Sequence, residues 1–256
     1  MPFPNLPDKY RGISLFNGKD FWEYKKNIKR YPEILPPKGI IFTFQPNLMT
    51  FILNNYPVKK IEYVFGDFYL LEQSHGNIGI CGNFGIGAPN AAILLEVFAA
   101  FGVKKFISIG TAGALQKDLE LGNIVVCNRA IRDEGTSHHY LQSEKYSHPS
   151  QGLNQKIKET VEKMGLKYCF GTSWTTDAPY RETIKEIEHY KEEGVSTVDM
   201  EASAVFAVAH ALKVDASAIF TISDYLGEKE WKPYFHLTDK HLQTLFKIAI
   251  NTLNSI

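Results

Sequence analysis

GNFGIGAPNAAILLEVFAAFGVKKFISIGTAGAL, residues 82–115, is the stretch of the chain from which the fold follows. A glycine-rich turn at Gly85 and Gly87 leads into an Ala- and Leu-rich segment, 89–101, whose apolar residues follow helical spacing. The run KKFISIG at 104–110 is then rich in β-branched and aromatic residues, which predicts a buried strand. A glycine turn, a helix and a strand in this order predict part of a βαβ unit.

The same alternation continues on both sides of this unit. It predicts an α/β fold in a single domain, with a central mixed, mostly parallel twisted sheet flanked by helices. We divide the chain into an N-terminal arm, 1–38, which is rich in Pro, Lys and aromatics without a clear period, and one domain, 39–256. Further strands are expected at 39–44, 61–72, 77–83, 122–128, 167–174 and 216–223, and helices near 151–164, 181–193 and 200–212. A last helix is expected to dock through one apolar face made of Leu242, Leu245, Phe246, Ala249, Ile250 and Leu253.

Composition argues against several classes of partner. The 28 Lys and Arg residues balance 28 Asp and Glu residues, so the basic excess typical of nucleic-acid-binding proteins is absent. No apolar run reaches the roughly 20 residues of a membrane span, and the N-terminus has no signal-peptide pattern. The three cysteines, an odd number in apolar runs, fit a reducing compartment. We therefore expect a soluble cytoplasmic protein with neither a nucleic-acid partner nor a membrane partner.

Two glycine motifs follow successive strands. Gly85 and Gly87 can let backbone N–H groups approach a ligand, although this motif taken alone is better explained by a simple strand-to-helix turn. They are not a dinucleotide fingerprint, because the third glycine is missing. The second motif, Gly110-Thr111-Ala112-Gly113, adds a hydroxyl that can bond an anion or a sugar oxygen. Two such motifs at strand ends predict the ligand-binding edge of an α/β sheet.

Two acidic residues complete the pattern. Glu201 in VDMEAS (198–203) stands at the start of an expected helix, where a first-turn acid favoured by the helix dipole is the alternative interpretation. Asp224 follows Ser223 in TISDY (221–225), at the end of an apolar strand-like run, where a capping role is the alternative. Both acids lie where open α/β sheets place ligands.

In order and spacing, these motifs resemble the nucleoside phosphorylase and nucleosidase superfamily, whose members cut the bond between a base and its ribose. The resemblance covers about residues 39–250. It implies that Met200 and Glu201 hold the ribose, and that Asp224 with Ser223 protonates or hydrogen-bonds N7 of a purine-type leaving base. The other substrate-binding positions that we derive from the motifs and the resemblance are Gly87, Thr111, Gly113, Arg132, His139, Tyr180 and Arg181.

The last four of these positions come from two loops. In AIRDEGTSHHYL, 130–141, adjacent histidines and carboxylates raise the possibility of a metal, but the spacing matches no zinc motif and we expect no metal. The resemblance places this loop near the sugar and base. TTDAPYRET, 175–183, corresponds to the loop that reads the base, where Tyr180 can stack and Arg181 can donate to a carbonyl.

The acceptor is where the chain departs from the resembling phosphorylases. These enzymes bind phosphate with arginines, whereas Leu48, Ser108 and, by approximate placement, Glu62 stand at the corresponding positions here. Each lost charge-assisted contact is worth roughly 1.5–3 kcal/mol. We therefore favour water slightly as the acceptor.

A second departure concerns the activation of water. Gln45 replaces the Glu that activates water in the resembling nucleosidases, so we expect Glu134 to take the proton, with Asp133 or a histidine of the same loop as alternatives. Phosphorolysis, with phosphate as co-substrate and ribose 1-phosphate as product, remains the first alternative if Arg132, Arg129 or a Lys supplies the charge. A non-catalytic nucleoside-binding or storage protein on the same fold is the second.

No cofactor other than this phosphate is expected. Because the sites of the resembling enzymes borrow residues across a subunit interface, we expect a homodimer or a higher homo-oligomer. The aromatic residues Phe65, Phe68 and Tyr69 are candidates for this interface.

Overall fold

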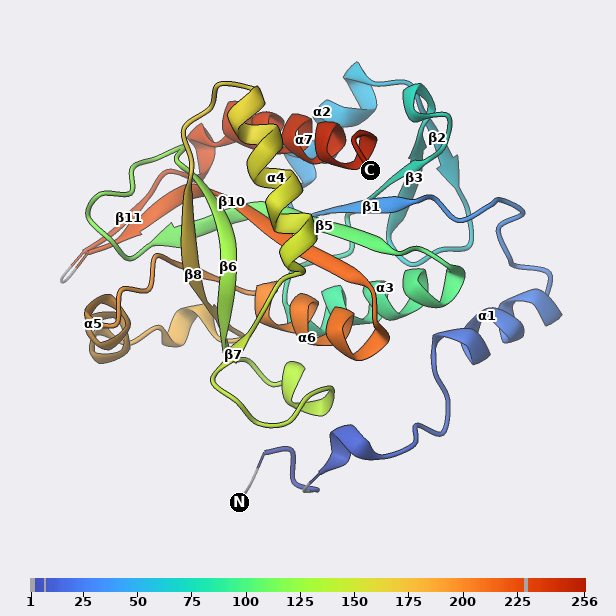
Figure 1. Ribbon diagram of the computed structural model, residues 1–256, viewed down its shortest axis with the longest axis horizontal. Coiled ribbons are helices and arrows are strands. Elements are labelled where there is room, and N and C mark those ends of the chain that lie inside the picture. The colour runs from blue at the N-terminus through green and yellow to red at the C-terminus, as the bar shows by residue number, and fades with distance from the viewer. Residues whose placement is uncertain (1–2, 7, 228–229) are drawn as a thin grey trace.

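A mixed β-sheet forms the centre of the protein, with helices on both faces (Figure 1). The computed structural model describes residues 3–6, 8–227 and 230–256. The strand order is β11-β10-β6-β8-β9-β5-β1-β4-β3-β2, with β7 paired to β6. The strands are β1 (Gly39–Thr43), β2 (Val58–Ile61), β3 (Asp67–Leu71), β4 (Ile78–Gly82), β5 (Lys105–Ala114), β6 (Ile124–Asp133), β7 (Tyr146–Ser147), β8 (Cys169–Thr176), β9 (Thr197–Asp199), β10 (Asp215–Leu226) and β11 (Trp231–Pro233). The α-helices are α1 (Gly18–Asn27), α2 (Pro46–Asn55), α3 (Ala88–Phe101), α4 (Gln151–Lys163), α5 (Ile184–Glu192), α6 (Ala202–Leu212) and α7 (Asp239–Asn254).

The expected mixed sheet is confirmed, and its parallel pairs fall into two groups. Strands β4, β1, β5 and β10 pair in parallel, as do β6, β8 and β9. Antiparallel pairs join the two groups, β10 with β6 and β5 with β9, and add the outer strands. The pairings β5–β10–β6–β8–β9–β5 therefore close into a ring, which the sequence analysis did not anticipate.

The ring brings the carboxyl ends of several strands to one place. In the ladders around β9, Val198 pairs with Gly113 at the end of β5, and Asp199 pairs with Thr175 of β8. Gly113 also pairs with Asp224 near the end of β10. The glycine and acidic motifs of the sequence are therefore neighbours in space.

Two hydrophobic layers hold the helices against the sheet. Ile40 and Phe42 of β1 face α3 and α6, whereas Ile41 between them faces α2, α4 and α7. This alternation follows from the period of two along a strand. No helix within the described ranges has both the length and the apolarity needed to cross a membrane. The predicted docking face of α7 is confirmed, because Leu242, Leu245, Phe246, Ala249, Ile250 and Leu253 are all buried.

Three local expectations were wrong. Helix α2 was missed, although Pro46 at its first turn is a common helix start. The expected strand 61–72 is broken into β2 and β3 by a turn in which Tyr63 and Gly66 have φ of 70° and 76°. The motif 110–113 lies inside β5, so it is strand rather than loop.

The N-terminal arm contains a helix that the sequence analysis did not predict. Trp22 is the only large buried side chain of helix α1, and the helix begins with a capping box formed by Asn17 and Asp20. The Trp22 indole donates to the carbonyl oxygen of Val97 at 2.7 Å, and its ring lies 5.2 Å from that of Phe101. Trp22 therefore anchors α1 on α3.

We predict that Trp22→Ala lowers the free energy of unfolding by about 3–5 kcal/mol, the usual cost of removing a buried aromatic side chain. Urea unfolding followed by circular dichroism measures it. Trp22→Phe keeps the ring packing and loses only the hydrogen bond to Val97, so it should cost less. Equal stability of wild type and Trp22→Ala would show that the arm does not depend on this anchor.

Candidate active site

Glu201 lies at the N-terminal end of α6 and faces the glycine turn before α3. The backbone N–H of Gly87 donates to Glu201 Oε1 at 2.6 Å, and only 8% of Glu201 is exposed. Gly87 has φ of 97°, a conformation that favours glycine, and this aims its N–H at the carboxyl group. Burial, followed by the negative charge of Asp199, raises the pKa of Glu201 to about 8. The structure thus joins two of the predicted substrate-binding residues, beside a half-buried Met200.

Asp199 holds this arrangement and was missed by the sequence analysis. Its Oδ1 accepts from Ser173 Oγ at 2.7 Å and Thr175 Oγ1 at 2.8 Å. Its Oδ2 accepts from the backbone N–H groups of Glu201 at 2.8 Å and Ala202 at 2.6 Å. Asp199 therefore caps α6 from outside the helix and fixes the position of Glu201. An acid two residues before an expected helix start was the signal available in the sequence.

Asp224 is held by two donors at the end of β10. Ser223 Oγ donates to Asp224 Oδ1 at 2.7 Å, and the Trp231 indole N–H donates to Oδ2 at 2.8 Å. The ladder with β5 shifts register between Ile222 and Asp224, so Asp224 lies opposite Gly113. Asp224 in turn influences a second carboxyl, that of Glu182. Burial, and then the charge of Asp224, raise the pKa of Glu182 to about 7.

Gly113 makes room for Asp224. A Cβ atom at Gly113 would lie 2.5 Å from Leu226 Cδ1 and 3.1 Å from Asp224 Oδ2. Packing against these two side chains is enough to require the glycine, and its predicted ligand-facing role stays a prediction.

The carboxyl ends of β1, β5 and β10 present neutral polar side chains on one face of the sheet. Gln45 Nε2 donates to Thr111 Oγ1 at 3.2 Å, and Thr221 pairs in register with Thr111. Gln45 Oε1, Thr43 Oγ1 and Thr221 Oγ1 are buried and have no hydrogen-bond partner within the described chain. Because buried polar atoms are nearly always bonded, this cluster is suited to a small polar ligand.

Cations are scarce at the positions where the resembling phosphorylases carry arginines. Leu48 is buried in the core beneath α7, and Ser108 is buried within β5. Glu62 lies exposed in the turn between β2 and β3. Arg129 Nε donates to Thr172 Oγ1 at 2.9 Å.

Glu134 and Arg132 stabilise their own loop. Glu134 accepts from the N–H groups of Thr136 at 2.5 Å and Ser137 at 2.9 Å, and from Ser203 Oγ at 2.8 Å. Arg132 donates to Ser137 Oγ at 2.9 Å and to the carbonyl oxygen of Gln142 at 2.6 Å. These contacts use most, but not all, of the hydrogen-bonding capacity of both side chains, so the roles of Glu134 as base and of Arg132 as substrate ligand stay predictions.

The remaining predicted residues, His139, Tyr180 and Arg181, are partly or fully exposed. His139 Nδ1 is 2.9 Å from Lys9 Nζ of the arm, and Tyr180 and Arg181 are exposed on a short 3-10 helix. In the described part of the chain, neither Tyr180 nor Arg181, the residues expected to read the base, has a recorded contact with Asp224. His138 Nε2 lies 3.0 Å from the carbonyl oxygen of Arg132. In the described part of the chain, no three His, Cys, Asp or Glu residues are grouped as metal ligands.

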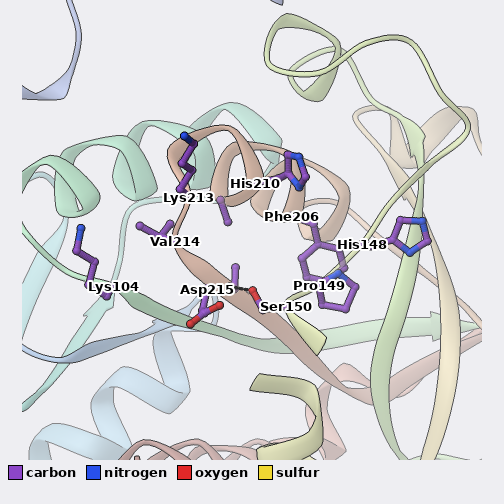
Figure 2. A pocket seen from close by; sticks show the side chains of 11 residues that line it. Lys104, His148, Pro149, Ser150, Phe206, His210, Lys213, Val214 and Asp215 are labelled. Carbon is purple, nitrogen blue, oxygen red and sulfur yellow. Dashed lines mark hydrogen bonds between the residues drawn. The ribbon is translucent and has the colours of Figure 1, made fainter. Parts of the chain in front are cut away.

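A separate open cavity of about 710 Å³ lies at the other end of β10, around Asp215 (Figure 2). Lys104, His148, His210 and Lys213 line it. It contains none of the predicted site residues. The candidate active site lies at the carboxyl end of β10, whereas this cavity lies at its amino end.

The family follows from a comparison with known proteins. Residues 40–251 match the family model described as the Phosphorylase superfamily. The chain belongs to this family. The resemblance inferred from the sequence is confirmed, and so is the nucleoside phosphorylase-like α/β fold.

Individual relatives carry different names. The guanosine phosphorylase of Halorubrum lacusprofundi is 33% identical over 150 residues, which are 59% of this chain and 62% of that protein. A DeoD-type purine nucleoside phosphorylase of Buchnera aphidicola is 33% identical over 149 residues, 57% of this chain and 64% of that protein. The matches thus span less than two thirds of these relatives. The structure of an AMP nucleosidase from Bacteroides thetaiotaomicron has a TM-score of 0.73 at 26% identity, over 92% of this chain and 97% of that one.

The raised pKa of Glu201 predicts a pH-dependent stability. Between pH 4.5 and about 8 the unfolded chain releases a proton that folded Glu201 retains, so Glu201 lowers stability as pH rises through this window. Glu201→Gln cannot ionise, and from pH 5 to 8.5 it should gain on the order of a few kcal/mol relative to wild type. Urea unfolding at both pH values measures this. The exposed Glu188→Gln should follow wild type, and parallel pH profiles for Glu201→Gln and wild type would contradict the prediction.

Proposed function

We propose that the protein cleaves the N-ribosidic bond of a purine-type nucleoside and that water is the acceptor. The neutral side chains around Gln45 and Thr111 support water as the acceptor, and Asp224 supports a purine as the base. Family membership supports cleavage of a nucleoside as the class of reaction. The names of the guanosine and purine nucleoside phosphorylases among the relatives support a purine.

The ribose and the base meet opposite ends of the site in this proposal. Glu201, fixed by Asp199 and Gly87, accepts hydrogen bonds from the ribose hydroxyls, and Met200 lies against the sugar. Asp224 protonates N7 of the leaving base or donates a hydrogen bond to it. A positioned acid contributes roughly 10²–10⁴-fold in rate, because it removes the cost of expelling an anionic purine.

The acceptor is positioned by neutral groups. The unpaired Gln45 Oε1 can accept a hydrogen bond from water, and the Thr111 hydroxyl completes the contact. A phosphate dianion would need compensating positive charge in this partly buried place. Gln45 cannot remove a proton, so its role is to orient water toward C1′ of the ribose. As the bond between C1′ and the base breaks, the base leaves with its electron pair and takes a proton from Asp224, and the proton that the attacking water loses is released to solvent. In this proposal Glu134, which accepts from Thr136, Ser137 and Ser203, is not the base.

Phosphorolysis is the second candidate, and the names of the curated relatives favour it over hydrolysis. It requires a cation at the Gln45 cluster, which a neighbouring copy of the chain would supply in a homo-oligomer. Light scattering that gives a particle of 29.0 kDa, the mass of one chain, would exclude this supply.

The deciding experiment incubates the protein with adenosine, guanosine, inosine, uridine and AMP, with and without phosphate, and identifies the sugar product. We expect cleavage of a purine substrate to give free ribose or ribose 5-phosphate, at a rate that phosphate changes little. Asp224→Asn should be nearly inactive, which assigns the activity to this site. A requirement for phosphate with ribose 1-phosphate as product would establish phosphorolysis instead. A folded protein that binds these compounds without cleaving them would support a binding protein.

We predict that Gln45→Leu, which keeps the side-chain size but removes both hydrogen-bonding groups, lowers kcat about 10- to 100-fold. The reason is the loss of one or two hydrogen bonds that orient the acceptor, each worth about 1 kcal/mol or more. KM for the nucleoside should change little, since Gln45 does not contact the base or ribose in this proposal. Steady-state kinetics test it, with the exposed Thr50→Ala of α2 as control. Unchanged kcat would remove Gln45 from the mechanism.

A further inference from the structure

The proposed function gives Asp224 a contact with the leaving base. Within the chain, each of its two carboxylate oxygens already accepts a hydrogen bond. Ser223 Oγ occupies Oδ1 at 2.7 Å, and the indole N–H of Trp231 occupies Oδ2 at 2.8 Å. On the other side, Oδ2 lies against Gly113, where a Cβ would be 3.1 Å away. Only 7% of Asp224 is exposed. A base that reaches Oδ2 therefore meets Trp231 first.

The two donors differ in how firmly they are held. Ser223 is 1% exposed and sits in the register shift between β10 and β5, with ladders on both sides of its strand. Trp231 is 60% exposed and begins the three-residue strand β11, which pairs only with β10 among the described strands. Its ring contacts Phe235, itself 48% exposed, at 6.2 Å between centroids. Trp231 can therefore move at little cost in buried surface, whereas Ser223 cannot.

We propose that Trp231 is a displaceable cap on Asp224: its indole N–H donates to Oδ2 until an N–H of the purine base, such as N7–H of the free base, donates to Oδ2 in its place. This inference rests on the proposed function. Trp231 thereby sets the affinity of the site for the base, because base and indole compete for one carboxylate oxygen. It is a positioning residue, since it acts on the substrate through Asp224.

Equilibrium binding of free purine bases tests the cap without any turnover. Adenine, hypoxanthine and guanine are titrated by calorimetry into wild type and Trp231→Phe, which keeps an aromatic ring and removes the N–H. The variant should bind the base that wild type prefers about 3- to 10-fold more tightly, the fold-change expected for loss of one competing hydrogen bond. Lys232→Ala, on the same strand, should bind like wild type. Equal or weaker binding by Trp231→Phe would overturn the proposal, and weaker binding would make Trp231 a direct contact of the base.

Fluorescence of the wild-type protein gives a second readout that does not depend on a variant. Trp22 and Trp174 are 4% and 1% exposed, so the long-wavelength emission that acrylamide quenches comes from Trp231. Saturation with the purine base should shift this emission and change its quenching. Unchanged emission at saturation would overturn the cap. If wild type cleaves nucleosides and binds bases, but neither the affinity of Trp231→Phe nor the Trp231 emission changes as expected, only the cap is wrong. If no base binds, the proposed purine site is wrong as well.

Discussion

The buried carboxylate of Asp199 is the interaction on which the site depends. It accepts four hydrogen bonds, from two hydroxyls of β8 and two backbone N–H groups at the start of α6. A buried carboxylate is tolerated only when its lone pairs are satisfied, so β8, β9 and α6 have one relative arrangement in which Asp199 fits. That arrangement fixes the position of Glu201. The same negative charge then helps to hold the proton of Glu201, which links the architecture to the ribose-side chemistry.

The electrostatic character of the site separates its two ends. At one end, the carboxyl groups of Glu201, Asp224 and Glu182 lie in a weakly solvated region, where desolvation raises the pKa of Glu201 and of Glu182. At the other end, Gln45 and threonine hydroxyls offer neutral donors and acceptors. Because opposite charge is absent around Gln45 among the described residues, a dianion desolvated there would be left uncompensated.

The sequence predicted the elements more reliably than their connections. The strands of the βαβ unit and the apolar face of α7 follow from local periodicity, and all were found. The break between β2 and β3 depends on Tyr63 adopting a positive φ, which no pattern announces for tyrosine. Helix α2 was overlooked because its start follows a strand directly and the residues around Pro46 were interpreted only as an altered ligand loop.

What the sequence determined by itself was the family, the α/β alternation, and the places of Glu201 at a helix start and Asp224 at a strand end. These depend on residue types at fixed spacing, which local chemistry constrains. Only the tertiary structure decided which side chains are free to act. Glu134 and Arg132 have chemistry suited to a base and an anion ligand, yet most of their hydrogen-bonding capacity goes to Ser203, Ser137 and Gln142. Whether a lone pair or an N–H is available depends on partners distant in sequence, and only the folded chain brings those partners within hydrogen-bonding distance.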